Sequence, residues 1–246
     1  MRRLISSALP LVSALMALIC LTGCSPAESK ANADSPAKRP AARIKAPVVM
    51  FLGDSYSAGL PGVRAEETYA AEAARRLRWQ VIIAGREGTG FVAPGQIGKT
   101  FGTLFAEQLA WRPAPDMIVV SGGHNDWPHS FELVQTAARR LLSEIKQRWP
   151  GTKVVLMGPL WGSDPPPKGL QVRDALADVA GELRVPFIDP LAEQWITGDI
   201  HSGIGNAQAY IRGDGTHPNP AGNRYFADRF IAALRKHGLT RPRLGP

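Results

Sequence analysis

The chain has 246 residues, of which 44% are hydrophobic and 20% are charged. This composition is typical of a globular protein and excludes a disordered, collagen-like or coiled-coil chain. Its 29 basic and 21 acidic residues give a formal net charge of +8. Seven of those basic and two of those acidic residues precede residue 47, so the net charge from there onward is only +3. No dense basic stripe with interleaved aromatic residues is present, which argues against a nucleic-acid partner.

The first 23 residues have the pattern of an export signal. Arg2 and Arg3 precede an uncharged stretch over residues 4–22, and Gly23 and Cys24 follow it. A basic start, an apolar stretch and small residues before a cleavage site are the three parts of such a signal. A permanent transmembrane helix is the alternative, since a stretch of this length can span a bilayer. Pro10 and three serines within the stretch disfavour that alternative.

Residues 21–24, Leu-Thr-Gly-Cys, resemble the lipobox of bacterial lipoproteins. The resemblance implies cleavage before Cys24 and attachment of a diacylglycerol to its thiol. Cys20 would leave with the signal, so the mature chain would hold one cysteine and no internal disulfide. Residues 25–46 are rich in alanine, proline and charge and cannot form a core. We therefore predict a signal peptide over 1–23, a lipidated Cys24 and flexible tether over 24–46, and a folded domain over 47–246.

From residue 47 the chain alternates short apolar runs with amphipathic segments. Strands are predicted over residues 47–52, 80–83, 117–120, 153–157 and 186–188. Helices are predicted over 66–77, 100–110, 131–149 and 169–183, with a last helix around 225–234. Nearly continuous apolar strands between amphipathic helices indicate a parallel sheet covered on both faces. The sequence thus predicts one α/β domain, a three-layer α/β/α arrangement with a five-stranded, mostly parallel sheet.

Four polar loops follow the first three predicted strands or precede the last helix. They are GDS at 53–55, a glycine-rich segment at 85–90, GHND at 123–126 and DGTH at 214–217. In order and placement they resemble the four motifs of the SGNH hydrolases, also called the GDSL esterase/lipase family. The resemblance covers nearly all of residues 48–237 and implies a flavodoxin-like fold. It also implies a catalytic triad of Ser55, Asp214 and His217.

The same resemblance implies an oxyanion hole made by Ser55, Gly88 and Asn125. Many relatives carry an asparagine several residues before the oxyanion glycine, and the preferred register places Ile83 at that position. Gly85 and Gly90 are the alternatives to Gly88. A further departure is Tyr56, which stands where the eponymous motif has leucine and is expected to leave the chemistry unaffected.

The chemistry of these residues supports the same roles. A serine hydroxyl needs an adjacent base, and a neutral imidazole such as that of His217 accepts a proton near pH 7. Asp214, three residues earlier, can orient the ring and stabilise the imidazolium. A tetrahedral intermediate needs hydrogen-bond donors, which the backbone N–H groups of Ser55 and Gly88 and the amide of Asn125 can supply.

These observations predict a membrane-tethered serine hydrolase of the cell envelope, acting on esters or thioesters without metal or cofactor. It would lie on the outer side of the cytoplasmic membrane, or be periplasmic or secreted, and be monomeric. Its partners would be a small-molecule, glycan or lipid ester and, through the anchor, the membrane. The alternatives are an O-acyltransferase or carbohydrate deacetylase on envelope glycans, and a non-catalytic binding lipoprotein.

Residues 93–100 imitate a phosphate-binding loop but do not join a strand directly to a helix. The five histidines show no metal-ligand spacing.

Overall fold

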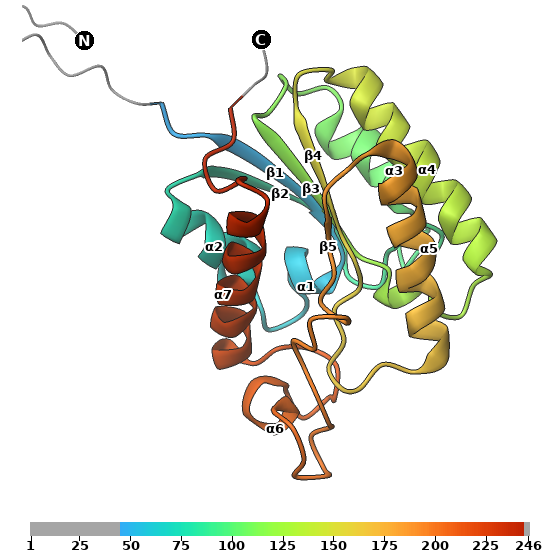
Figure 1. Cartoon of the computed structure of the whole chain (residues 1–246), viewed down its shortest axis with the longest axis vertical. Helices are drawn as coiled ribbons and strands as arrows, with labels where there is room; N and C mark the ends of the chain where they lie inside the picture. The colour runs from blue at the N-terminus through green and yellow to red at the C-terminus, as the bar shows by residue number, and fades with distance from the viewer. Residues whose placement is uncertain (1–44, 244–246) are drawn as a thin grey trace, which may run out of the picture. The chain divides into compact units, whose positions relative to one another are not determined.

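Five parallel strands form the central sheet, in the order β2-β1-β3-β4-β5 (Figure 1). They are β1 (Val48–Gly53), β2 (Gln80–Gly85), β3 (Met117–Ser121), β4 (Lys153–Met157) and β5 (Phe187–Ile188). The chain passes from β1 outward to β2 and then crosses back to β3 on the other side of β1. Such a reversal opens a crevice at the carboxyl ends of the strands, where ligands bind in sheets of this kind.

The computed structural model describes residues 45–243. The predicted signal peptide, Cys24 and nearly all of the predicted tether lie outside the described residues. Among residues 45–243, no helix is both long enough and apolar enough to cross a membrane.

Helices cover both faces of the sheet (Figure 1). On one face lie α2 (Tyr69–Leu77) and α7 (Pro220–Lys236), and on the other lie α3 (Phe101–Leu104), α4 (Phe131–Arg148) and α5 (Pro167–Leu183). Two short helices occur near the carboxyl ends of the strands, α1 (Ser55–Ala58) and α6 (Ala207–Tyr210). Short turns of other helical types are η1 (Ala65–Glu67), η2 (Phe105–Leu109) and η3 (His124–Asp126).

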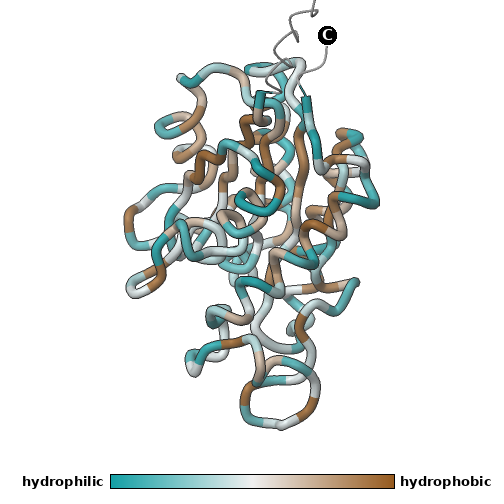
Figure 2. The backbone as a smooth tube through the Cα atoms, turned by 90° about the vertical axis from the view of Figure 1, so that its left-hand side faces the viewer, coloured by the Kyte–Doolittle hydropathy of each residue, from teal (hydrophilic) through white to brown (hydrophobic). Residues whose placement is uncertain are grey.

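Alternation along the buried strands divides the core into two layers. In β1, Val49 and Phe51 pack under α2 and α7, whereas Met50 and Leu52 pack under α3, α4 and α5. The four side chains are at most 1% exposed. Successive side chains of a strand point to opposite faces, so a strand buried on both faces has to be apolar throughout. Figure 2 shows these strands as hydrophobic segments inside a more polar surround.

The predicted fold class is confirmed, and every predicted strand is present within two residues of its expected ends. The helix predicted over 66–77 is instead η1 followed by α2, because Thr68 between them has extended backbone with φ −77° and ψ 164°. The helix predicted over 100–110 changes from α-helical to π-helical geometry at Phe105. The short α1, α6 and η3 were not predicted, since segments of three or four residues carry no periodic signal.

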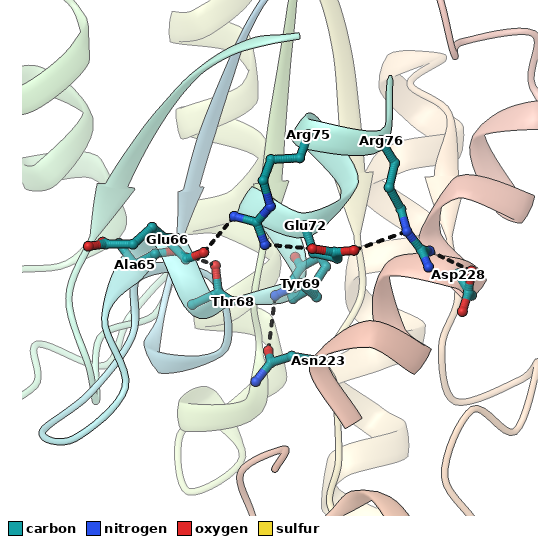
Figure 3. A network of polar contacts seen from close by, with 9 residues as sticks. All are labelled: Ala65, Glu66, Thr68, Tyr69, Glu72, Arg75, Arg76, Asn223 and Asp228. Carbon is teal, nitrogen blue, oxygen red and sulfur yellow. Dashed lines mark hydrogen bonds and ion pairs between the residues drawn. The ribbon is translucent and has the colours of Figure 1, made fainter. Parts of the chain in front are cut away.

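Polar contacts join α2 to α7 on the sheet face that the two helices cover (Figure 3). Arg76 bridges Glu72 of α2, at 3.0 Å, and Asp228 of α7, at 2.5 Å. Beneath them, the backbone N–H of Tyr69 donates to Asn223 Oδ1 over 2.9 Å, and both residues are buried. A hydrogen bond shielded from water is harder to replace than an exposed ion pair. The Asn223 contact therefore fixes the first turn of α7, and with it the loop that precedes α7.

Candidate active site

Ser55 lies at the carboxyl end of β1, as the first residue of α1. The Asp54 side chain caps this short helix by accepting from the Tyr56 N–H over 3.0 Å. Ser55 is 5% exposed, so most of its surface is already removed from water. Within residues 45–243 its backbone N–H has no hydrogen-bond acceptor, as expected at a helix start. A sharp strand-to-helix turn thus presents both a hydroxyl and a free N–H at the carboxyl end of the inner strand β1.

The structure brings Ser55, His217 and Asp214 together in one hydrogen-bonded chain. Ser55 Oγ lies 2.9 Å from His217 Nε2, across 162 positions of sequence. On the other side of the ring, His217 Nδ1 lies 3.0 Å from Asp214 Oδ2. With Asp214 ionised, Nδ1 must carry the proton, which leaves Nε2 free to accept one from the Ser55 hydroxyl.

The Asp214 carboxylate also accepts two hydrogen bonds from its own loop. Its Oδ1 lies 2.9 Å from the backbone nitrogens of both Thr216 and His217. Partial burial acts to raise the pKa of Asp214, but these N–H groups and the His217 side chain outweigh it and lower the pKa. Asp214 is therefore ionised at neutral pH and available to stabilise an imidazolium.

Tyr56 holds the loop that carries His217, a contact that the sequence did not reveal. Its hydroxyl donates to the Thr216 carbonyl over 2.7 Å, and its ring lies 5.5 Å from the His217 ring between centroids. The side chain is 2% exposed, and burial raises the pKa of Tyr56, so the phenol stays protonated and can donate. A leucine at this position would provide packing but no hydrogen bond.

The three candidate oxyanion glycines have different surroundings. The Gly85 N–H donates to Gln108 Oε1 over 3.1 Å, and the Gly90 N–H donates to the Ala93 carbonyl over 2.8 Å. In the described part of the chain, the Gly88 N–H has no such acceptor. A β-carbon at Gly90 would overlap the Asp126 carboxylate, so close packing explains that glycine. Of the three, Gly88 alone has an N–H left to donate to a ligand.

Asn125 is tied to the loop that holds Gly88. Its Nδ2 donates to the Thr89 carbonyl over 2.9 Å, which uses one of the two amide hydrogens and leaves the other. The next residue, Asp126, is fully buried and accepts from three consecutive backbone nitrogens, Phe91 at 2.9 Å, Val92 at 2.8 Å and Ala93 at 2.9 Å. The second half of the GHND motif thus fixes the loop after β2 against the loop after β3.

Ionisation of the Asp54 side chain is costly because the residue is buried. It is 1% exposed, and burial, with a smaller contribution from the nearby Asp126, raises its pKa from 3.8 to about 7. The folded protein therefore keeps a proton that the unfolded chain loses, so the contribution of Asp54 to stability declines as pH rises from about 4 to 7.

Asp54→Asn is expected to remove this decline, because asparagine still caps α1 but cannot ionise. Relative to wild type, the variant should gain about 3 kcal/mol in the free energy of unfolding between pH 4.5 and pH 8. Urea unfolding at both pH values measures the difference. A constant difference between the two proteins would show that Asp54 has an ordinary pKa.

No group of three or more histidine, cysteine, aspartate or glutamate side chains within residues 45–243 is placed to hold a metal ion.

Comparison with known proteins identifies the family of this chain. The model of the GDSL-like lipase/acylhydrolase family matches residues 51–225, a span that contains all four motif loops. The chain belongs to this family. It is 30% identical over 196 residues to a GDSL lipase of Mycobacterium tuberculosis, a match that covers 76% of this chain and 80% of the relative.

Solved structures show the GDSL fold at lower sequence identity. A family two carbohydrate esterase from Clostridium thermocellum, in complex with cellohexaose, is similar with a TM-score of 0.60 and 21% identity, over 79% of this chain and 66% of that one. A salicylyl-acyltransferase from a tetracycline biosynthetic pathway is similar with a TM-score of 0.59 and 21% identity, over 81% and 57%. At this identity the likeness establishes the fold and no more.

Proposed function

We propose that this GDSL-family protein hydrolyses carboxylic esters through an acyl-enzyme formed on Ser55. The observation that carries the proposal is the continuous chain of hydrogen bonds from Ser55 through His217 to Asp214. The distances of 2.9 and 3.0 Å are within the reach that proton transfer needs, which supports Ser55 as nucleophile, His217 as base and Asp214 as orienting carboxylate.

In the first half of the reaction, Ser55 Oγ attacks the acyl carbonyl while His217 Nε2 takes the hydroxyl proton. Asp214 stabilises the imidazolium that forms. The tetrahedral intermediate collapses as His217 returns the proton to the leaving alcohol, which breaks the ester bond. In the second half, His217 deprotonates a water that attacks the acyl-enzyme. The acyl–Oγ bond then breaks as His217 returns that proton to Ser55 Oγ, which releases the carboxylic acid and regenerates Ser55.

The negative charge of each tetrahedral intermediate needs donors that are in place before it forms. Of the groups expected to form the oxyanion hole, the Ser55 and Gly88 backbone N–H groups and the second Asn125 amide hydrogen all lack an acceptor within residues 45–243. We assign the oxyanion hole to these three groups.

Asn125→Ala is expected to lower kcat for ester hydrolysis by about 10²- to 10³-fold, since one oxyanion donor is lost. The KM should change little, because the donor acts mainly on charge that develops in the transition state. Steady-state kinetics on 4-nitrophenyl acetate measures both constants. Asn206→Ala, which alters an amide in the 198–213 loop, serves as the control for a general loss of an asparagine. A loss confined to KM would contradict the oxyanion role of Asn125.

The acyl chain and the alcohol are best defined by a panel of substrates. We expect turnover of 4-nitrophenyl esters, compared over increasing acyl length beside an acetylated polysaccharide and a thioester. Transfer of the acyl group to an added sugar would show that water is not the preferred acceptor, which is the O-acyltransferase alternative. Release of acetate from the polysaccharide would identify a carbohydrate deacetylase. Binding of an ester without any turnover would contradict the proposed hydrolase and favour a binding lipoprotein.

We further propose that the hydrolase is anchored at the membrane through a lipid on Cys24. Two features of the sequence support this proposal. Residues 21–24 resemble a lipobox, and residues 25–46 are rich in alanine, proline and charge and poor in large apolar side chains. A flexible segment of that length has a root-mean-square reach of roughly 25 Å. The segment joins the folded domain before the amino end of β1, whereas Ser55 follows the carboxyl end of β1. The site would therefore lie away from the attachment point.

Cys24→Ser is expected to release the protein from the membrane fraction and to remove the acyl mass from its N-terminus. Fractionation of the producing cells and mass spectrometry of the intact protein measure the two effects. Hydrolysis by the variant should equal that of wild type, because the substitution lies outside the folded domain. A mature N-terminus at another residue, without lipid, would contradict the proposal.

A further inference from the structure

His124 lies beside the candidate site rather than on the open surface. Its ring centroid is 5.5 Å from that of Tyr56, and the Tyr56 ring is in turn 5.5 Å from the His217 ring. The His124 ring is also 4.3 Å from Trp161 between centroids. Tyr56 therefore contacts both imidazole rings, and Trp161 contacts that of His124.

The segment that contains Trp161 also contacts the loop that contains His217. A β-carbon at Gly162 would lie 2.5 Å from the Gly215 carbonyl and 2.6 Å from the Thr216 carbonyl, so the two backbones pass close together. The preceding carbonyl, that of Leu160, is 3.1 Å from His124 Nδ1. Residues 160–162 thus form one wall that contacts both His124 and the Asp214–His217 loop.

The hydrogen bond to Leu160 determines the chemistry of the His124 ring. A carbonyl only accepts, so Nδ1 must carry the proton, and Nε2 of the neutral ring is left with a lone pair. Burial, aided by the nearby His217, lowers the pKa of His124 to about 4, so the ring is neutral wherever the hydrolase would work. Nε2 is thus a hydrogen-bond acceptor and not a cation.

This acceptor is free. Within residues 45–243, His124 Nε2 has no hydrogen-bond partner from the protein. It is also not a fully buried atom. Solvent therefore reaches Nε2, whereas Nδ1 and much of the ring are covered. A partly buried acceptor with no protein donor is suited to a donor on a ligand.

We infer that His124 Nε2 and the adjoining Trp161 form a subsite for an ester whose alcohol part carries a free hydroxyl, as in a polyol or sugar. The inference rests on the proposed hydrolase function. The leaving alcohol must lie at His217 Nε2, which protonates it, and the His124 ring contacts the same Tyr56 ring that the His217 ring contacts. A hydroxyl close to the ester oxygen can therefore donate to His124 Nε2 while the ester occupies Ser55.

The test compares 2-hydroxyethyl acetate with 2-methoxyethyl acetate. The two esters differ only in that a methyl group replaces the hydroxyl hydrogen, so the second ester cannot donate a hydrogen bond. We expect wild type to favour the hydroxyl compound in kcat/KM by roughly three- to tenfold, the range of one neutral hydrogen bond. His124→Phe keeps a ring between Tyr56 and Trp161 but has no acceptor, and its ratio should fall to about one. Because the ratio is taken within one preparation, it does not depend on the fraction of active enzyme.

His124→Gln is the matched variant, since its terminal oxygen can reach the position of Nε2 and accept. It should retain at least part of the preference, which also covers the case in which His124→Phe folds poorly. An equal ratio in wild type and His124→Phe, or no preference in wild type, would overturn the subsite while leaving ester hydrolysis intact. Failure of wild type to hydrolyse either acetate or 4-nitrophenyl acetate would overturn the proposed function itself.

Discussion

Ser55→Ala is expected to lower kcat for ester hydrolysis by at least about 10⁴-fold and up to about 10⁶-fold, with little change in KM. The substitution removes the nucleophile but leaves the Ser55 backbone N–H, Gly88 and Asn125 in place. What remains should be the modest rate that oxyanion donors and binding give without a nucleophile. Measurement of kcat on 4-nitrophenyl acetate, with protein purified from an esterase-deficient host, tests this prediction.

Ser57→Ala is the matched control for the nucleophile. Ser57 lies two residues on in the same short helix, and its hydroxyl is 3.0 Å from the Tyr69 hydroxyl. Its loss should cost about 1 kcal/mol of stability and leave turnover within about tenfold of wild type. The reverse ranking, with Ser57→Ala inactive and Ser55→Ala active, would exclude Ser55 as the nucleophile.

His217→Ala and Asp214→Asn are expected to be the next most damaging changes. Removal of the base should cost about as much as removal of the nucleophile, because the two act as a unit. Asp214→Asn should lower kcat by about 10⁴-fold, since an amide at this position no longer favours the proton on Nδ1 or stabilises the imidazolium. The expected order is His217→Ala at least as damaging as Asp214→Asn, with substrate binding largely kept in both.

His201→Ala provides a control for loss of a histidine, because His201 is exposed in the loop before α6 and, within residues 45–243, its side chain makes no hydrogen bond to Ser55, Asp214 or His217. Its kinetic constants should equal those of wild type. A mild effect of His217→Ala would mean that another group takes the Ser55 proton, and would refute the triad as assigned.

The meeting of Ser55 and Asn125 could be predicted because it depends on topology. Parallel strands place their carboxyl ends on one side of the sheet, so the polar residues that follow β1 and β3 had to come close together. The place of His217 in the site was instead implied by the resemblance of the DGTH loop to the fourth motif of the family. The apolar runs were separated clearly enough, by glycine after the first four and by Asp-Pro after the fifth, to define all five strands. Asp214 followed from its spacing of three residues before His217 within one loop.

Other features of the site depend on contacts that no local pattern encodes. The Tyr56 hydroxyl donates to the Thr216 carbonyl, 160 positions away, and no local pattern distinguishes this role from the packing that a leucine would provide. The choice among Gly85, Gly88 and Gly90 depended on which backbone N–H groups already had acceptors. The position of His124 beside the site likewise depends on its contacts with Trp161 and Leu160, which lie 36 or more positions away.

The central claim is that Ser55 forms a covalent acyl-enzyme, and mapping of a covalent adduct tests it most directly. The purified full chain is treated with a fluorophosphonate, digested, and analysed by tandem mass spectrometry. The hydrogen-bonded chain predicts one phosphonate on Ser55 and none in Ser55→Ala. An adduct on a different residue, or continued ester hydrolysis by a chain that the fluorophosphonate does not modify, would contradict it.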